Sequence, residues 1–264
     1  MSIKSKILII AGSDSCGGAG IQIDIRTAAH FKTHAAAVIT CLTAQNTQGV
    51  SAIYVPPIEF LEQQLNSVFD DIKFDAIKIG MLFNAEIISC VADILEKRAK
   101  KIPVILDTVM IATSGDLLLK QDAIELLKSR LFRDVFLVTP NIDEAEVLAE
   151  MKIENLDDMK RAALKIQTLG VKNILIKGGH INLSAKKIIN LLLDEKGKFH
   201  LITNNRVKIN KIHGTGCSLA SAIACNIAKK IPLVKAIKNP NQYVFKAIKK
   251  STKIGAGSHI LGLV

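Results

Sequence analysis

The sequence is short of aromatic residues and of the features that mark membrane or disulfide-bonded proteins. Its 264 residues include no tryptophan and only two tyrosines. The longest stretch without charged residues runs from Thr33 to Ile58 and ends near Pro56 and Pro57, so no bilayer-spanning helix is expected. The five cysteines form no CxxC pair, which argues against a disulfide framework or zinc site and favours a reducing cytoplasm.

Acidic residues are scarce in the second part of the chain. Residues 161–264 contain 19 Lys and Arg but only Asp194 and Glu195, whereas residues 1–160 contain 16 Lys and Arg against 22 Asp and Glu. A basic region favours an anionic partner, which could be nucleic acid, a membrane surface or phosphate groups. A nucleic-acid-binding protein would need stacking aromatics, and this region has only Phe199, Tyr243 and Phe245.

Short apolar, β-branched runs alternate with helical patterns along the chain. The predicted strands cover 7–11, 35–42, 51–55, 76–79, 104–106, 135–138 and 173–176, followed by a hairpin over 186–209. The predicted helices cover 21–31, 58–69, 84–98, 114–129, a segment that begins at 141 or 143, 155–169, 218–229 and 233–250. This alternation predicts an α/β sandwich with a mostly parallel sheet, in a single domain over 1–264. The first apolar run is too short for a signal peptide.

Ligands of such sheets bind at the carboxyl ends of the strands, so the residues that follow each strand are informative. A glycine-rich turn, Gly12 to Gly20, follows the first strand and lets a ligand approach the backbone. Asp24, in the next helix, is either a partner of the helix dipole or a ligand residue. Gln45 offers a donor and an acceptor that suit the edge of a heterocycle, and Met81 either fills the core or lines an aromatic ligand.

Oxygen-bearing side chains follow two later strands. Asp107 follows one of them, and Thr139, Asn141 and Glu144 follow the next at the start of a helix. A carboxylate and an amide three residues apart can hold a hydrated Mg²⁺ beside phosphates. The same spacing is also typical of simple helix capping, so both interpretations stay open.

The sharpest signal is the sequence HGTGCS over 213–218, which opens an apolar helix. Gly214 and Gly216 free the backbone, so that several N–H groups can converge on an anion at the helix N-terminus. Cys217 lies where the helix dipole is most positive, and we expect its pKa to fall below the usual ~8.5. It is then a candidate general base.

These segments together resemble the hydroxymethylpyrimidine/phosphomethylpyrimidine kinases of thiamine biosynthesis, members of the ribokinase-like superfamily. The matching blocks span almost the whole chain and are IAGSDSCGGAGIQIDI (10–25), VITCLTAQNTQGV (38–50), KIGMLFNAEI (78–87), VTPNIDEAEVL (138–148), ILIKGGH (174–180) and HGTGCSLASAIA (213–224). The resemblance implies a ribokinase-like three-layer α/β/α sandwich. It also implies phosphorylation of 4-amino-5-hydroxymethyl-2-methylpyrimidine and then of its monophosphate by ATP with Mg²⁺. A cytoplasmic homodimer is implied, with no nucleic-acid or membrane partner.

The resemblance also assigns roles by position. The residues expected around the pyrimidine are Gly12, Asp24, Gln45, Met81 and Val109. The residues expected on the nucleotide side are Thr139, Asn141, Lys177 and Gly179, with Asp107 and Glu144 toward Mg²⁺. The residues expected to form the anion hole and catalytic centre are Gly214, Thr215, Gly216 and Cys217.

The chain departs from the family pattern at a few positions. Thr108 stands where the family usually has Pro, Thr113 where it has Lys, and Asn190 where an acidic residue is common. The loss of a cation at 113 bears on the efficiency of the second phosphorylation. Two alternatives stay open: a pyridoxal kinase of the same superfamily and, more remotely, a basic nucleic-acid-binding protein.

Overall fold

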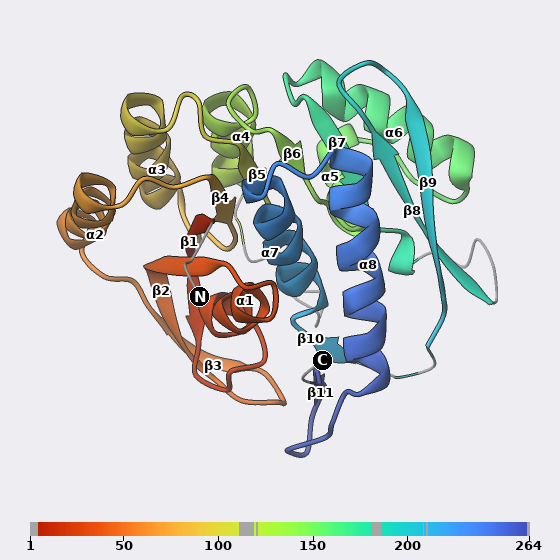
Figure 1. Cartoon of the computed structure of the whole chain (residues 1–264), viewed down its shortest axis with the longest axis horizontal. Helices are drawn as coiled ribbons and strands as arrows, with labels where there is room; N and C mark the ends of the chain where they lie inside the picture. Colours follow the sequence, from red (N-terminus) through yellow and green to blue (C-terminus); the bar gives the residue numbers. More distant parts are fainter. Residues whose placement is uncertain are drawn as a thin grey trace.

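The computed structural model describes residues 5–110, 119, 121–180, 186–207, 209 and 211–262. Within them, nine strands form one sheet in the order β3-β2-β1-β4-β5-β6-β7-β8-β9 (Figure 1). The strands are β1 (Lys6–Asp14), β2 (His34–Gln45), β3 (Val50–Tyr54), β4 (Ala76–Ile79), β5 (Val104–Leu106), β6 (Leu137–Val138), β7 (Asn173–Ile176), β8 (Lys187–Leu193) and β9 (Phe199–Asn205).

The centre of the sheet is parallel and its margins are antiparallel. β1 pairs in parallel with β2 and β4, and parallel pairing continues through β5, β6 and β7. β3 pairs antiparallel with β2, and β8 and β9 form the predicted hairpin. The central strands are rich in Ile and buried on both faces, as expected of a parallel sheet covered by helices.

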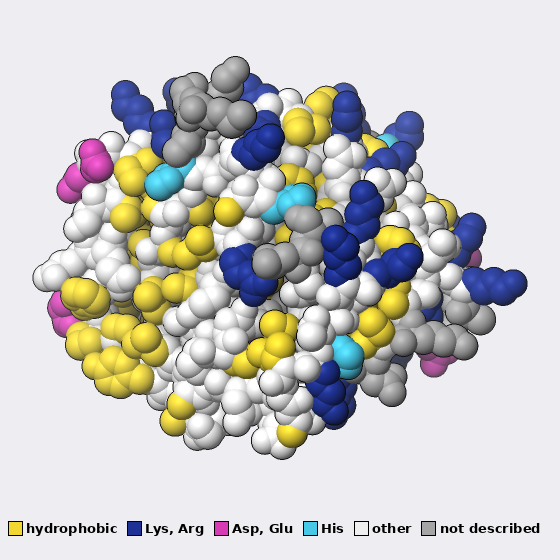
Figure 2. Space-filling view, turned by 60° about the horizontal axis from the view of Figure 1, so that its bottom comes forward, with side chains coloured by type: hydrophobic (Ala, Val, Ile, Leu, Met, Phe, Trp, Pro, Cys, Tyr) yellow, Lys and Arg dark blue, Asp and Glu magenta, His cyan; other side chains and the backbone are white. Residues whose placement is uncertain are grey.

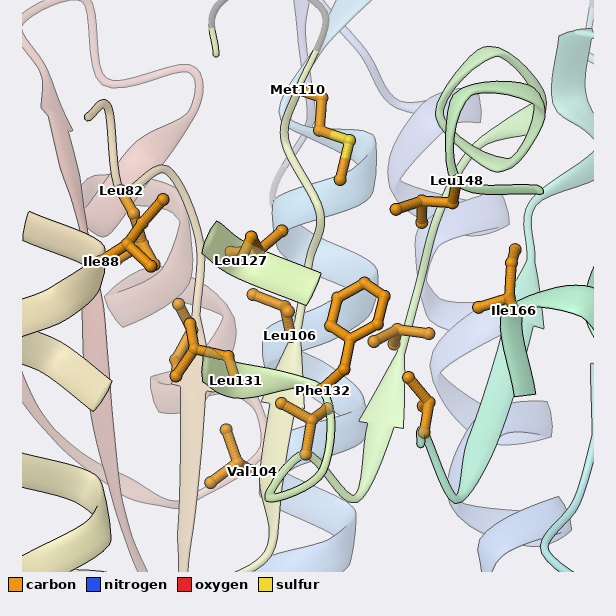
Figure 3. Close-up of a cluster of buried hydrophobic side chains, with 14 of the residues drawn as sticks. Leu82, Ile88, Val104, Leu106, Met110, Leu127, Leu131, Phe132, Leu148 and Ile166 are labelled. Atoms are coloured by element: carbon orange, nitrogen blue, oxygen red, sulfur yellow. The ribbon is translucent and has the colours of Figure 1, made fainter. Parts of the chain in front are cut away.

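Helices cover both faces of the sheet, which confirms the three-layer α/β/α sandwich (Figure 1). One face packs against α2 (Ile58–Asp71), α3 (Ala85–Arg98), α4 (Gln121–Leu131), α5 (Ile142–Ala149) and α6 (Leu156–Thr168). The other face packs against α1 (Gly20–His30), α7 (Thr215–Ala228) and α8 (Leu233–Lys249). Figure 3 shows part of the first core, where Phe132 lies among Leu106, Leu127 and Leu131.

Most element boundaries follow the sequence signals. The Asn84 side chain caps α3 by accepting from the N–H of Ile87 at 2.9 Å, and Asn155 caps α6. β1 is longer than predicted, because Ser13 and Asp14 continue the ladder with β2, so the glycine-rich turn begins only after Asp14. β2 likewise continues to Gln45, which pairs with β3. The predicted start of a helix at residue 114 lies outside the described residues.

A second, two-stranded sheet joins residues 259–260 to the segment that leads into α7. β10 (Ile212–His213) and β11 (His259–Ile260) pair in parallel. Just before β11, the N–H of Ser258 donates to the carbonyl oxygen of Thr47 at 2.7 Å, and that of Gly257 to its hydroxyl at 3.1 Å. In the described part of the chain, no helix is long and apolar enough to cross a membrane.

Candidate active site

The carboxyl ends of the parallel strands bring most of the predicted site residues to one edge of the sheet. β1, β2, β4, β5, β6 and β7 all end at this edge, and the N-terminus of α7 approaches it from one face. β10 and β11 lie at the bottom of Figure 1, and Figure 2 turns that side forward. Lys and Arg side chains are prominent there and Asp and Glu are few, so this side of the molecule favours anions.

The loop after β1 is organised by Asp14, whose role was not predicted from the sequence. Its carboxylate accepts hydrogen bonds from the backbone N–H groups of Cys16 at 2.8 Å, Gly18 at 3.0 Å and Ala19 at 2.8 Å. The side chain is buried. An Asp directly before a run of small residues is a signal for such a turn. Asp14 thereby fixes the path of the glycine-rich loop.

Replacing Asp14 by Ala should loosen this loop. Three N–H groups lose a charged acceptor, a change that we expect to destabilise the loop by about 2 kcal/mol or more. Hydrogen–deuterium exchange of a peptide covering residues 15–20 should speed up at least tenfold. Asp14→Asn keeps one acceptor oxygen, so its exchange rate should lie between those of the unmodified protein and Asp14→Ala. Unchanged exchange in the Ala variant would contradict the organising role.

The pyrimidine-side residues meet where β1, β2 and β4 end. A Cβ atom on Gly12 would lie 2.9 Å from the sulfur of Cys41 and 3.8 Å from that of Met81, so these three residues are in contact. The Thr40 hydroxyl donates to the Met81 carbonyl at 2.7 Å. The Gln45 side chain accepts from Thr43 at 3.0 Å. Met81 is half-buried, and its polarizable sulfur suits contact with a flat ring, whereas Cys41 is fully buried.

Asp24 does not face this space. Its carboxylate is fully buried and lies 2.6 Å from the ammonium group of Lys78, in an ion pair. It also accepts a 2.7 Å hydrogen bond from the Ser221 hydroxyl of α7. The side chain is therefore engaged behind the edge, and a direct contact with substrate stays a prediction. Val109 is half-buried in the segment after β5, and its role also stays a prediction.

The N-terminus of α7 forms the expected cradle of backbone amides. Gly214 is the N-cap residue, with a φ of 81° that favours glycine, and Thr215, Gly216 and Cys217 make the first turn. A Cβ atom on Gly214 would collide with the carbonyl oxygen of Gly18, so the two glycine-rich segments touch. The first N–H groups of a helix have no intrahelical acceptor and are free to bind an anion.

A lysine that follows β7 and a carboxylate that follows β5 lie directly at this cradle. The Lys177 ammonium donates to Oδ1 of Asp107 at 2.8 Å, and the Thr139 hydroxyl donates to the same oxygen at 3.0 Å. A Cβ atom on Gly216 would lie 3.1 Å from the Lys177 nitrogen and 3.3 Å from Oδ2 of Asp107. Burial works against ionisation of Asp107, but Lys177 and Lys78 hold its pKa below the usual value. The Lys177–Asp107 pair is therefore charged and beside the amides.

The expectation that Cys217 has a lowered pKa is wrong. Burial raises the pKa of this thiol to about 11, even though Lys78 and a hydrogen bond from the Gly20 backbone favour the thiolate. The nearby carboxylates Asp24 and Asp107 add to the rise. Loss of water thus outweighs the Lys78 charge and the Gly20 hydrogen bond, and a pKa of about 11 leaves the thiol protonated at neutral pH.

Asn141 and Glu144 form a reciprocal capping box at the start of α5. The Asn141 side chain accepts from the N–H of Glu144 at 2.8 Å, and the Glu144 carboxylate accepts from the N–H of Asn141 at 2.8 Å. Thr108 also donates to Glu144, at 2.9 Å. The capping interpretation therefore accounts for both residues. Among the described residues, no group of three or more His, Cys, Asp and Glu side chains could hold a metal ion.

Gly179 lies just beyond the Lys177 position. It belongs to a single 3₁₀ turn, Gly178–His180, and its carbonyl accepts from Arg206 at 3.2 Å. Asn190, where acidic residues are common in the resembling family, binds the N–H of Gly178 at 3.0 Å and the Asn241 side chain at 3.0 Å. An amide can accept from the backbone and donate to Asn241 at once, which a carboxylate cannot.

The fold and this edge define a class of protein. A three-layer α/β/α sandwich whose strand ends meet an amide cradle and a charged lysine is a small-molecule kinase of the ribokinase-like type. The comparison of the chain with known proteins narrows this class.

The chain belongs to the phosphomethylpyrimidine kinase family, whose model matches residues 14–261. A hydroxymethylpyrimidine/phosphomethylpyrimidine kinase from Aquifex aeolicus is 40% identical over 254 residues, which cover 96% of this chain and 98% of that protein. A thiamine biosynthesis bifunctional protein from Geobacter sulfurreducens is 42% identical over 98% of this chain. The match spans only 53% of that longer relative.

Solved structures agree in fold. The crystal structure of a phosphomethylpyrimidine kinase from Clostridium difficile has a TM-score of 0.82 at 39% identity, covering 93% of this chain and all of that one. A pyridoxal kinase from Bacillus subtilis, in complex with ADP, has a TM-score of 0.90 at 28% identity and covers 98% of this chain and 97% of that one. Family membership removes the argument for a nucleic-acid-binding protein.

Proposed function

We propose that the protein transfers the γ-phosphoryl group of ATP to the hydroxymethyl oxygen of 4-amino-5-hydroxymethyl-2-methylpyrimidine, and then phosphorylates the resulting monophosphate. The observation that carries this proposal is the meeting of three parts at one sheet edge. These are the amide cradle of α7, the charged Lys177–Asp107 pair beside Gly216, and the half-buried Met81 next to Gly12. The relatives named above carry the same activity in their names.

In the first step, the hydroxymethyl oxygen forms a bond to the γ-phosphorus while the bond to the bridging oxygen of ADP breaks. Little covalent chemistry is required of the protein, and catalysis depends on positioning and on neutralising charge. The amides of Gly214 to Cys217 and the Lys177 ammonium are suited to the charge on the transferring group. The proton of the hydroxyl group leaves to Cys217 in its thiolate form or to water.

A polar cavity supports the placement of the nucleotide beyond Lys177. It has a volume of about 380 Å³ and lies between the β8–β9 hairpin and α8, lined by Lys187, Thr203, Asn204, Asn205, Gln242, Phe245 and Lys246. The Asn204 side chain donates to the Asn241 carbonyl at 2.8 Å, and Asn241 is bonded to Asn190, which holds Gly178. The cavity is thus joined to the Lys177 segment, and its two lysines suit an anionic ligand.

Mg²⁺ fits this edge as a hydrated ion held mainly by phosphates. Such ions need one or two carboxylates and keep several waters. The two hydrogen bonds to Asp107 described above both end on Oδ1, while Oδ2 faces Gly216, and Glu144 is near enough to raise the pKa of Lys177 together with Asp107. Asp107 and Glu144 would hold the ion through water. When bound, Mg²⁺ supplies positive charge to the β- and γ-phosphates.

Three further expectations accompany the proposal. We propose that the chain is one domain, because nine of the eleven described strands lie in one sheet with cores on both faces. A homodimer is proposed from the family resemblance, and light scattering of the purified protein tests it. A cytoplasmic location is proposed from the five cysteines, which form no CxxC pair.

The test of the function is a substrate panel. Purified protein with ATP and Mg²⁺ is offered the hydroxymethylpyrimidine, its monophosphate and pyridoxal, and products are separated by mass. We expect mono- and diphosphate from the pyrimidines, with kcat/KM for pyridoxal at least about a hundredfold lower, as expected where a pocket is built to hydrogen-bond one ring. Equal or stronger use of pyridoxal would overturn the assignment, since the same fold carries that activity in the Bacillus subtilis relative.

A further inference from the structure

Lys78 is the most deeply buried cation that the structure describes near this site, and the reaction outlined above leaves it without a role. It lies on β4, and its ammonium is 2.6 Å from Oδ2 of Asp24 on α1. Both side chains are 0% exposed. Removing two charges from water costs several kcal/mol for each ion, so a buried pair is weak evidence for stability alone.

The ion pair is anchored directly beneath the first turns of α7. Asp24 accepts from Ser221 at 2.7 Å. One turn earlier in α7, the Ser218 hydroxyl is hydrogen-bonded to that of Thr27 at 3.0 Å. Both contacts join α1 to the helix whose N-terminus is the amide cradle. On the other side, a Cβ atom on Gly80 would lie only 2.8 Å from the Lys78 nitrogen, so glycine leaves the room that this ammonium occupies.

Two carboxylates and two ammonium groups surround Cys217. Four charged groups act on it or lie beside it: Asp24 from α1, Lys78 from β4, Asp107 after β5 and Lys177 after β7. Each ammonium neutralises one carboxylate. Lys177 is 16% exposed and can reach a phosphate, whereas Lys78 is closed off and can act only through its neighbours. Its pKa is raised, because Asp24, Cys217 and Asp107 outweigh the effect of burial, so its charge is permanent.

We propose that Lys78 is a positioning residue for phosphoryl transfer. Its fixed charge acts on Cys217 more strongly than that of Asp24, keeps the potential at the α7 N-terminus positive and favours the thiolate of Cys217. Without Lys78, whether or not Asp24 is present, the site where negative charge gathers in the reaction loses this positive charge. The inference rests on the proposed function.

The test separates charge from stability with a double variant. Lys78→Met and Asp24→Asn each leave one buried charge unpaired and should lower the melting temperature. The double variant removes both charges, and we expect its melting temperature to return close to that of the unmodified protein. Its kcat for the hydroxymethylpyrimidine should still fall about tenfold or more, with KM for ATP changed less than threefold. A stable double variant with kcat within twofold of the unmodified protein would overturn the proposal.

A second readout needs no substrate. Iodoacetamide labelling of Cys217, followed on its own peptide by mass spectrometry at pH 8.5, reports the thiolate fraction. Lys78 acts on this thiol more strongly than Asp24 does. Labelling should therefore slow at least about threefold in Lys78→Met and in the double variant, because one pKa unit is tenfold in thiolate.

Ser221→Ala is the matched control, since it removes a hydrogen bond to Asp24 and leaves every charge in place. A structural role for Lys78 would loosen the site and speed labelling in Ser221→Ala and Lys78→Met alike. Faster labelling in Lys78→Met therefore counts against the proposal, and slowing confined to the variants without Lys78 supports it. Failure of the proposed function is recognised separately, as unmodified protein that phosphorylates neither pyrimidine.

Discussion

Replacing Cys217 by Ala should lower kcat for the hydroxymethylpyrimidine by about 10²–10⁴ if the thiolate accepts the substrate proton. The raised pKa of about 11 adds a signature to this loss. Below that pH the thiol is protonated, and the thiolate fraction grows about tenfold for each pH unit until the pKa is reached. In the unmodified protein, kcat should therefore climb with pH between 7 and 9, and Cys217→Ala should lose that climb.

Single-turnover kinetics over this pH range measure both effects. Cys90→Ala, a half-buried cysteine on α3, is the control for loss of a thiol elsewhere. An unchanged kcat in Cys217→Ala would contradict the proton-accepting role. Stabilisation of the transferring phosphoryl group by the backbone amides would then remain as the role of this turn. A pH profile that is flat in both proteins would indicate that bound nucleotide and Mg²⁺ change the thiol, or that water takes the proton.

The second large effect is expected from Gly214→Ala. The residue has a φ of 81°, and an added Cβ atom would strike the carbonyl oxygen of Gly18. The first turn of α7 must then shift, and the amides that hold the transferring phosphoryl group lose their alignment. We expect kcat/KM to fall by about 10²–10³, the loss typical when one donor of such a site is removed.

Gly49→Ala is the control for the substitution itself. No atom lies within 4 Å of a Cβ placed there, and its backbone does not require glycine. Its melting temperature and kcat/KM should stay within error of the unmodified protein. A Gly214→Ala protein that keeps full activity would mean that the cradle tolerates movement, and it would weaken the case for amides as the main stabilising groups.

The sequence predicted the order of elements because each strand and helix carries a local signal. The Asn84 cap and the hairpin over residues 186–209 are determined by residues close together in the sequence, and both are confirmed. The ends of β1 and β2 were predicted too early, because Gly12, Ser13 and Thr43 look like turn residues until their pairing partners are known.

The site was harder to predict where burial decides the chemistry. A helix N-terminus is visible in the sequence, but the loss of water around Cys217 is not, and burial reversed the sign of its pKa shift. Asp24 and Lys78 are 54 residues apart, and no spacing rule joins them. The Asn141–Glu144 box spans three residues, and accordingly it was visible as a candidate cap from the start.

The contact between the end of the chain and Thr47 has a consequence for how the enzyme is made. Gly257 binds Thr47, which lies 210 positions earlier in the chain, and β11 completes the small sheet that leads into the amide cradle. Contacts of such long range form late, after the loop between them has been closed. During synthesis, the hydrophobic core of the sandwich can pack before the β10–β11 sheet beside the active site forms. We therefore expect the nascent protein to gain activity only after residues 257–260 have left the ribosome and bound Thr47 and β10.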